Sequence, residues 1–454
     1  MFFWIEIMKS PSRFFIGIAG TITVGFLATS SVQASPLNLQ FLGQSIVPTG
    51  FIPSGSAGTV NGVSVPVGGL SGITYDPAGN NFYIISDDRS QNGPARFYTA
   101  TIDPTLFNVN GTNSGVTFTG VTPLLQTNGQ TFPALSLDPE GIALVGSNLY
   151  ISSEGEVSSN QILNPFVNRF ALANGQQNDT LPIPNQFIPA PNSIPTTSGV
   201  RNNLALESLT TTPDQRFLFT ASENALVQDG PVATPTNGSP SRILQYNLAN
   251  GQPIAQFLYN TDPIALPPII PTPFDINGLV DLLALDNSGK RFLSLERSFS
   301  ITTGTPGNTG YTVKIYEVSL EGATDISAFF SINGVSGIVA AQKTLLFDLT
   351  SLNIPIDNVE GITFGPDLPN GKRSIILVSD NNFTQLQFTQ FLAFGVETVP
   401  EPSTLAGLLV IGCGVILVKK TGKLNKIWQQ HRDQAIFRVA ERFVNWTMAL
   451  LGSV

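Results

Sequence analysis

The sequence predicts an all-β protein whose strands form a β-propeller, and three observations lead to this prediction. A motif of two apolar runs, joined by a turn and in most copies closed by Ser-Asp or Ser-Glu, occurs five times. Charged residues make up only 12% of the chain, against about 25% in typical soluble domains. Gly, Pro, Asn, Thr and Ser fill the difference, which is typical of short strands separated by turns.

The five copies of the motif follow one another along the chain, with the closing residues of adjacent copies about 67–84 residues apart. Self-similarity at this period, in units made of strands, predicts one propeller blade per copy. The copies are Leu70–Ile73 with Ile85–Asp88, Pro139–Ile142 with Ser152–Glu154, Leu206–Leu209 with Ser222–Asn224, Gly278–Leu279 with Leu295–Arg297, and Val359–Ile362 with Ser379–Asn382.

The N-terminal end has the pattern of a targeting segment. Lys9 and Arg13 precede an apolar run over residues 14–28, and a small-x-small triplet follows at residues 32–34. This order predicts a secretory signal peptide over residues 1–34, with a retained membrane anchor as the alternative. We therefore expect an exported protein of the cell envelope, the cell surface or the extracellular space.

The C-terminal end carries Pro-Glu-Pro at residues 400–402, an apolar run over residues 405–418, and then two lysines. This order resembles the PEP-CTERM sorting signal of exported bacterial proteins, which implies membrane anchoring of residues 399–420 and a sortase-like processing enzyme as partner. The run is short for a lone membrane span, which takes about 20 residues. Residues 421–454, which that signal normally lacks, predict a basic amphipathic helix on a membrane surface or against a neighbouring element.

Between residues 35 and 418 the chain carries 13 Lys and Arg against 28 Asp and Glu. This acidic balance argues against a nucleic-acid partner and is compatible with cation binding. The single Cys413 and the single His431 lie outside the predicted propeller, residues 35–398. The propeller therefore has no disulfide, no Ser-His-Asp triad and no Cys or His metal ligand. Oxygen ligands favour Ca²⁺, or less often Mg²⁺.

Repeated carboxylates are the candidate site. Glu140, Glu207 and Glu360 share one position, at the start of what should be the innermost strand, and are the candidate catalytic and metal-binding residues. Asp87 and Asp380 close the second runs and complete the predicted metal ligands. Neighbouring carboxylates repel one another unless a cation neutralises them or some are protonated. The alternative is that these acids only stabilise turns.

Arginines near the repeated acids are the candidates for binding an anionic substrate such as phosphate through forked hydrogen bonds. Arg96 and Arg242, at strand starts further out, are expected to form salt bridges between blades instead. The predicted substrate-binding residues are Arg89, Arg201, Asn203 and Arg297.

Longer motifs around these residues resemble the phytase-like (esterase-like) family of exported bacterial proteins, over roughly residues 65–396. They are Gly69–Ile73 with Ile85–Arg89, Asp138–Ile142, Arg201–Glu207, Glu223–Leu226, Leu295–Phe299, Asn358–Ile362 and Ser379–Phe383. The resemblance implies a propeller related to the calcium-dependent β-propeller phytases, with six blades, although only five repeats are legible. The sixth is expected around residues 310–350, and residues 37–47 are expected to close the ring against residues 391–397.

Together these features predict an exported, Ca²⁺-dependent hydrolase that acts on phosphoesters of a small-molecule substrate. Calcium-dependent phytases surround their phosphates with Lys, Arg, His and Tyr, whereas this propeller has four Lys and no His. Two alternatives therefore stay open. One is a propeller lactonase or esterase of the gluconolactonase type, and the other is a non-catalytic propeller that binds a ligand or partner in the envelope or matrix.

Overall fold

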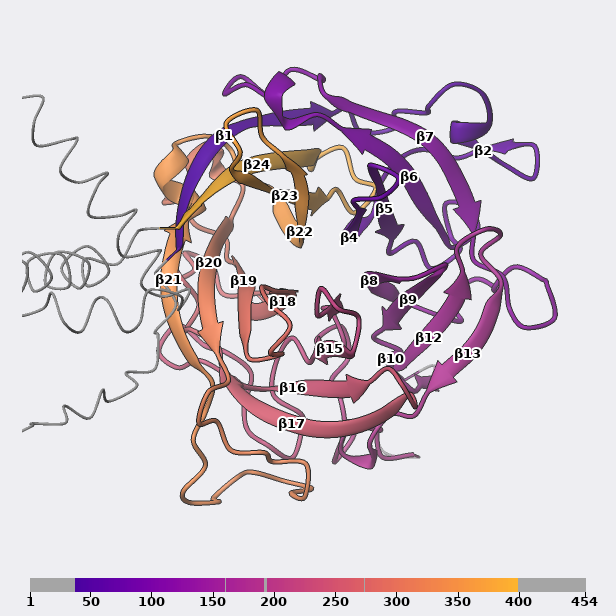
Figure 1. The fold of residues 1–454 in the computed structure, drawn as a ribbon. Helices are drawn as coiled ribbons and strands as arrows, with labels where there is room; N and C mark the ends of the chain where they lie inside the picture. Colours follow the sequence, from indigo (N-terminus) through magenta and orange to yellow (C-terminus); the bar gives the residue numbers. More distant parts are fainter. Residues whose placement is uncertain (1–36, 160, 192–193, 273, 399–454) are drawn as a thin grey trace, which may run out of the picture. The chain divides into compact units, whose positions relative to one another are not determined.

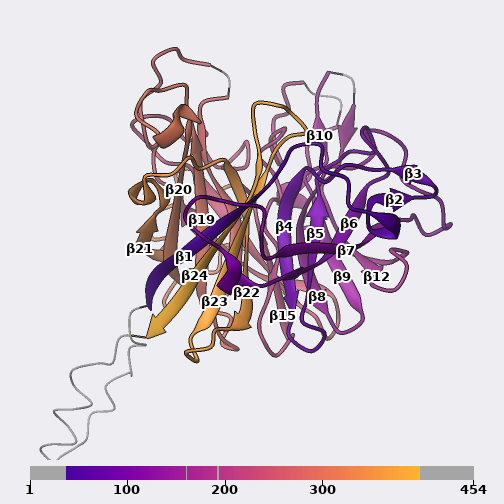
Figure 2. The ribbon, with the colours of Figure 1, turned by 90° about the horizontal axis from the view of Figure 1, so that it is seen from above.

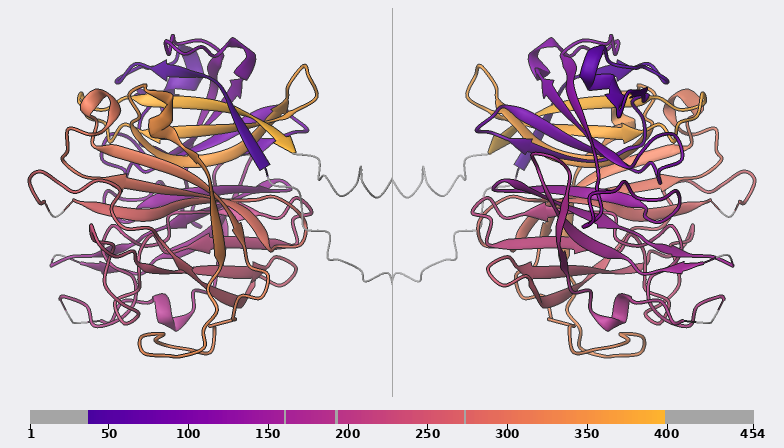
Figure 3. Two further views of the ribbon diagram at one scale, coloured as in Figure 1. Left: turned by 90° about the vertical axis from the view of Figure 1, so that its left-hand side faces the viewer. Right: turned by 90° about the vertical axis from the view of Figure 1, so that its right-hand side faces the viewer.

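The computed structural model describes residues 37–159, 161–191, 194–272 and 274–398, and these residues form a β-propeller. Five four-stranded antiparallel sheets surround one axis (Figure 1), and their connecting loops lie at both ends of the strands (Figures 2 and 3). The propeller prediction is confirmed, with one blade per sequence repeat. The described residues contain no sixth four-stranded sheet, because the stretch around 310–350 supplies the two outer strands of the fourth blade.

The blades are numbered here in chain order, and each is given from its innermost strand outwards. Blade 1 contains β4 (Leu70–Asp76), β5 (Asn81–Ser86), β6 (Arg96–Ile102) and β7 (Val116–Pro123); blade 2 contains β8 (Pro139–Val145), β9 (Asn148–Ser153), β12 (Phe166–Ala171) and β13 (Gln177–Leu181); blade 3 contains β14 (Thr210–Thr211), β15 (Phe217–Ala221), β16 (Pro240–Asn247) and β17 (Gln252–Asn260); blade 4 contains β18 (Ile276–Ala284), β19 (Arg291–Phe299), β20 (Tyr311–Ser319) and β21 (Gln342–Asp348); blade 5 contains β22 (Asn358–Asp367), β23 (Arg373–Asp380), β24 (Thr389–Thr398) and β1 (Leu37–Val47).

Blade 5 closes the ring with strands from both ends of the described chain. β1 pairs antiparallel with β24, with Leu37 opposite Thr398 and Val47 opposite Thr389. The predicted closure is therefore confirmed. Because this pairing joins the first strand to the last, it covers the sheet edges that would otherwise be left open between the two chain ends.

Short elements complete the fold. Two hairpins are formed by β2 (Thr59–Val60) with β3 (Val63–Ser64) and by β10 (Glu156–Val157) with β11 (Ile162–Leu163). The helices of the described residues are single 3₁₀ turns: η1 (Gly55–Gly58), η2 (Pro104–Leu106), η3 (Asn185–Phe187), η4 (Pro306–Asn308) and η5 (Leu349–Leu352). None of them is long and apolar enough to cross a membrane. The predicted signal peptide, sorting segment and helical tail, residues 1–34 and 399–454, lie outside the described residues.

The core consists of five apolar clusters, and each lies between two neighbouring blades. Between blades 5 and 1, for example, Ile376 and Phe391 join Ile84 and Tyr98, and all four side chains are fully buried. Burying such side chains contributes about 1.5–3 kcal/mol each. The apolar side chains of the middle strands therefore form the contacts between blades, and polar residues lie near the axis.

Gly72 and Gly141 occupy the same position of the repeat and have a steric role near the axis. A Cβ atom on Gly141 would lie 2.7 Å from the carbonyl oxygen of Glu207, and one on Gly72 would lie 2.5 Å from the carbonyl oxygen of Glu140. Real Cβ atoms do not approach a backbone oxygen so closely. Glycine therefore lets the innermost strands of adjacent blades converge, and this brings Glu140 close to Glu207 of the next blade.

A buried ion pair holds part of blade 4 against blade 3. The Nε and Nη2 atoms of Arg242 donate to the two carboxylate oxygens of Asp229 at 2.6 and 2.9 Å, and both side chains are completely buried. Arg242 also donates to the carbonyl oxygens of Phe329 and Phe330, in the long loop between β20 and β21. Arg242 and Arg96 both form ion pairs, but each pair lies within one blade and not between two as expected. Arg242 and Asp229 belong to blade 3, and Arg96 pairs with Asp88 at 2.7 Å in blade 1.

Substituting Arg242→Met should lower the free energy of unfolding by about 3–5 kcal/mol, because it leaves the Asp229 carboxylate buried without its partner. The matched control is Arg216→Met, since Arg216 pairs with Asp214 but its side chain is 62% exposed. That control should cost at most about 1 kcal/mol. Urea unfolding of both variants measures the difference, and equal losses would show that the buried pair contributes no more than the exposed one.

Candidate functional site: an acidic pocket on the propeller axis

Two positions of the repeat bring carboxylates to one end of the axis. One lies near the start of the innermost strand, and the other lies at the end of the next strand or just after it. Because these strands are antiparallel, the start of one lies beside the end of the other. In blade 2, Pro139 pairs with Ser153. Glu140 and Glu154 are the next residues in the sequence, and both line the same pocket.

The pocket has a volume of about 860 Å³ and is lined by all five blades and their loops. Ten carboxylates line it, against two guanidinium groups. All five predicted metal ligands are among the acids, so the structure brings together residues that are up to 293 positions apart in the sequence. The lining acids are Asp87, Asp88, Asp138, Glu140, Glu154, Glu207, Glu223, Asp275, Glu360 and Asp380.

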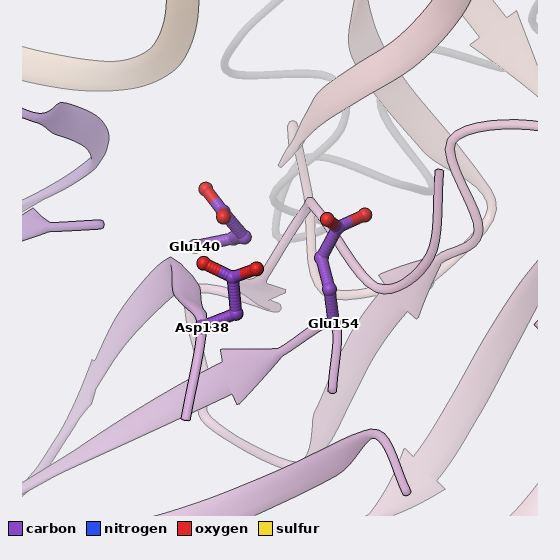
Figure 4. A group of neighbouring side chains, drawn as sticks. All are labelled: Asp138, Glu140 and Glu154. Carbon is purple, nitrogen blue, oxygen red and sulfur yellow. The ribbon is translucent and has the colours of Figure 1, made fainter. Parts of the chain in front are cut away.

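Two groups of three buried acids have the spacing of metal ligands. Asp138, Glu140 and Glu154 offer carboxylate oxygens within 4.8 Å of one another, and their side chains gather at the axial end of blade 2 (Figure 4). Glu154, Glu207 and Glu223 form a second such group. Glu154 therefore belongs to both groups. The oxygen-only donor set suits a hard cation such as Ca²⁺ or Mg²⁺, and this structure identifies no ion.

Burial and mutual repulsion make these acids hard to ionise together. Burial raises the pKa of Glu140, Glu154 and Glu207 well above the usual range, and neighbouring carboxylates add to the shift. Burial raises the pKa of Asp138 to about 7 although Arg89 opposes the shift. A bound cation would reverse this tendency, because it stabilises the ionised carboxylates.

Glu360 and Asp380 form a pair of neighbouring acids in blade 5, apart from the two groups of three. Asn358 joins them, since its Nδ2 donates to Glu360 Oε1 at 2.9 Å and to Asp380 Oδ2 at 3.4 Å. Burial and then the charge of Glu360 raise the pKa of Asp380 to about 8. Burial also raises the pKa of Glu360 to about 7, although Arg297 opposes the shift. These two groups can therefore hold a proton near neutral pH.

Blade 4 departs from the pattern of the other blades. Leu279 pairs with Glu296, so Glu296 occupies the position that Ser153 has in blade 2, and Arg297 occupies the position of Glu154. Glu296 accordingly lies outside the pocket lining and accepts hydrogen bonds from Tyr259 and Asn277. Blade 4 thus contributes a cation to the pocket where the other blades contribute an acid.

Arg297 is paired within the protein. Its Nη2 atom lies 3.1 Å from Glu360 Oε1 and 3.5 Å from Glu223 Oε1. Burial lowers the pKa of Arg297, but the charges of Glu223 and Glu360 outweigh this effect and raise it. Arg297 therefore acts first as an internal counterion of the acids. Its Nε atom has no hydrogen-bond partner among the described residues.

The other predicted substrate-binding residues have different surroundings. Arg89 lines the pocket and pairs with Glu156 at 2.5 Å and Asp138 at 3.6 Å. Asn203 lines the pocket from an exposed loop. Arg201 is not part of the lining, because its guanidinium donates to the carbonyl oxygens of Ala225 and Gly230. Two of the three predicted arginines thus reach the pocket.

Sequence reasoning left three members of the two acid groups out of the ligand set. Glu154 and Glu223 occupy the same repeat position as Asp87 and Asp380, so the repeat itself could have included them. Asp138 carries no such signal. It joins the group because its carbonyl oxygen accepts a hydrogen bond from the backbone N–H of Glu154.

Fold and site together define a β-propeller with a buried, acid-lined pocket at one end of its axis, suited to binding cations. The model of the family described as "Phytase-like: Esterase-like activity of phytase" matches residues 65–383, and the chain belongs to this family. No curated protein matches the sequence.

The solved structures that resemble this fold have low sequence identity to this chain and low TM-scores. The Dos1 propeller is 7% identical with a TM-score of 0.31, covering 73% of this chain and 69% of that one. A Pseudomonas aeruginosa periplasmic gluconolactonase is 12% identical with a TM-score of 0.31, covering 81% and 100%. A Bombyx mori GH32 β-fructofuranosidase is 10% identical with a TM-score of 0.33, covering 72% and 58%. These values are too low to inform the function.

Proposed function

We propose that this protein is an exported hydrolase that cleaves phosphoesters with the help of a bound divalent cation, and that the cation is Ca²⁺. The observation that carries the proposal is the pair of buried acid groups that share Glu154. A pocket with ten acids and two arginines repels phosphate. A phosphoester could therefore enter only with cations that neutralise the acids.

The chain's own residues suggest how the work is divided. Asp138, Glu140, Glu154, Glu207 and Glu223 would hold the cation, which in such sites polarises a phosphoryl oxygen and lowers the pKa of water. Glu360 pairs with Arg297, Asp380 is joined to Glu360 through Asn358, and the raised pKa values of both acids let either hold a proton near neutral pH. Either could donate that proton to a leaving oxygen.

Ester or lactone cleavage is the second candidate, and one observation favours it. Among the described residues, the cationic side chains that line the pocket are Arg89 and Arg297, and both are paired with acids of the protein. An uncharged ester can bind without unpaired arginines, whereas a polyphosphorylated substrate needs them to form hydrogen bonds with its phosphates. The third option, a propeller that binds a ligand without cleaving it, would use the same acids for a structural cation.

The export and membrane association predicted from residues 1–34 and 399–454 are part of the proposal. The acidic pocket supports a small-molecule partner over nucleic acid, since phosphate backbones require basic surfaces. Whether a sortase-like enzyme processes the C-terminal segment would be decided by the mass of the mature protein, since cleavage removes the residues that follow the Pro-Glu-Pro motif.

A substrate panel tests the proposal. Protein stripped with a chelator should release phosphate from phosphomonoesters only after Ca²⁺ is restored, and the rate should rise at least about 100-fold. Aryl esters and δ-lactones form the second arm, with and without Ca²⁺. Calcium-dependent cleavage in that arm alone would overturn the phosphoesterase and establish the esterase. Calcium binding without cleavage of any substrate would establish the binding propeller.

A further inference from the structure

The pocket has two unlike walls, and blade 4 forms the unlike one. By register, Val280 stands where blades 2, 3 and 5 have Glu140, Glu207 and Glu360, and Arg297 stands where the other blades have an acid. No acid from these two repeat positions therefore comes from blade 4. The side chains of this part of the lining are Phe274, Asp275, Ile276, Phe299 and Tyr311. Asp275 is the one acid among them, and its carboxylate accepts hydrogen bonds from the backbone N–H and the hydroxyl of Thr272.

This wall is aromatic and open to solvent. Phe274 leaves 73% of its surface exposed. Among the described residues, no other phenylalanine is exposed to this extent. The rings of Phe299 and Tyr311 contact each other with centroids 4.9 Å apart. The Tyr311 hydroxyl accepts a hydrogen bond from Gln387 Nε2. What these residues offer a ligand is mainly ring surface, together with the O–H donor of Tyr311.

Unused polar atoms lie beside the aromatic wall. Arg297 Nε has no hydrogen-bond partner among the described residues, and neither has Asn358 Oδ1, although the Asn358 side chain is 97% buried and lines the pocket. A buried polar atom without a partner costs free energy, so a ligand that supplies one gains affinity. One donor and one acceptor match a group with an ester oxygen or a hydroxyl, and they are too few for several phosphates.

We propose that the wall formed by Phe274, Ile276, Phe299 and Tyr311 binds the organic part of the substrate, and that this part is an uncharged ring bearing a single ester group. The assignment rests on the proposed function and narrows it to monoesters of ring compounds. The acids of blades 2 and 3, with their cation, take the ester group, and the ring lies against blade 4. The two parts of the substrate differ in charge. The charged ester group gains nothing from an aromatic face, whereas the uncharged ring does.

Binding of two inert phosphonates to the full chain loaded with Ca²⁺ tests this assignment. Phenylphosphonate and methylphosphonate have the same charged head and differ only in the ring. By titration calorimetry, phenylphosphonate should bind about tenfold more tightly, the gain expected when one ring covers another. Phe274→Ala should remove most of this difference and leave the methylphosphonate affinity unchanged.

Two further variants separate the wall from other effects. Phe299→Leu should also reduce the preference, because it removes ring surface and keeps an apolar side chain. Leu386→Ala is the matched control, since Leu386 is 95% exposed and does not line the pocket; its preference should equal that of the unaltered protein. Equal affinity of the two phosphonates, or a preference that survives Phe274→Ala, would overturn the wall and leave the phosphoesterase standing. Binding of neither phosphonate would overturn both.

Discussion

Without divalent cations, the protein should unfold at a higher temperature at pH 5 than at pH 8, by roughly 5–10 °C. Burial raises the pKa of Asp138 and Glu360 to about 7 and that of Asp380 to about 8. In the unfolded chain the same groups titrate near pH 4. Between these values the folded protein binds more protons than the unfolded one, so its stability falls as the pH rises from about 4 to about 8.

Scanning calorimetry with a chelator present measures this effect. Adding Ca²⁺ at pH 8 should restore most of the lost stability, because the cation replaces the protons as counter-charge for the acids. Asp380→Asn should reduce the pH effect in the chelated protein, since it removes one of the titrating groups. A transition temperature that is the same at both pH values would show that the pocket acids are ionised in the folded protein without a cation.

Replacing Glu154 by Gln should weaken Ca²⁺ binding at least about 100-fold and abolish the stabilisation by Ca²⁺ at pH 8. Glu154 belongs to both acid groups, so its loss affects both. A unit charge about 4 Å away is worth about 4 kcal/mol at an effective dielectric constant near 20, and each 1.4 kcal/mol is a factor of ten. Gln keeps the shape of the side chain and can still accept the hydrogen bond from the backbone N–H of Ala205.

Glu296→Gln is the matched control for this substitution. Glu296 is as buried as Glu154, but it pairs with Lys343 and lies outside the pocket. The control should lose stability and keep its response to Ca²⁺. Titration calorimetry and thermal scans of the two variants separate the cases, and a Glu154→Gln protein with unaltered Ca²⁺ affinity would contradict the site.

The convergence of Glu140, Glu207 and Glu360 was predictable because propeller blades repeat. Residues at the same position of different blades lie at the same height near the axis, so these three glutamates had to come together once the blades closed. The Glu-Gly pair carried the same information, since only glycine permits the close approach at Gly141. Ring closure by residues 37–47 was predictable for a related reason, because an open sheet edge favours pairing with another strand.

The roles within blade 4 depend on how its sequence aligns with the other blades. The same β-bulge occurs in the inner strands of blades 1, 2, 4 and 5, so register alone does not set blade 4 apart. Glu296 stands at the position where the other blades have a serine, and Arg297 stands at the position of the acids, so Glu296 lies outside the pocket and Arg297 lines it. Spacing could not tell that the guanidinium of Arg201 is used by the carbonyl oxygens of Ala225 and Gly230.

The sequence by itself determined the fold class, the five blades and the oxygen-only chemistry of the pocket. These follow from the composition, from the local alternation of apolar and polar residues, and from a sequence motif that recurs in each blade. Only the tertiary structure decided which acids share a cation, which arginine meets them and where the aromatic wall lies. Those features depend on residues from different blades, whose meeting is set by long-range packing and leaves no local trace in the sequence.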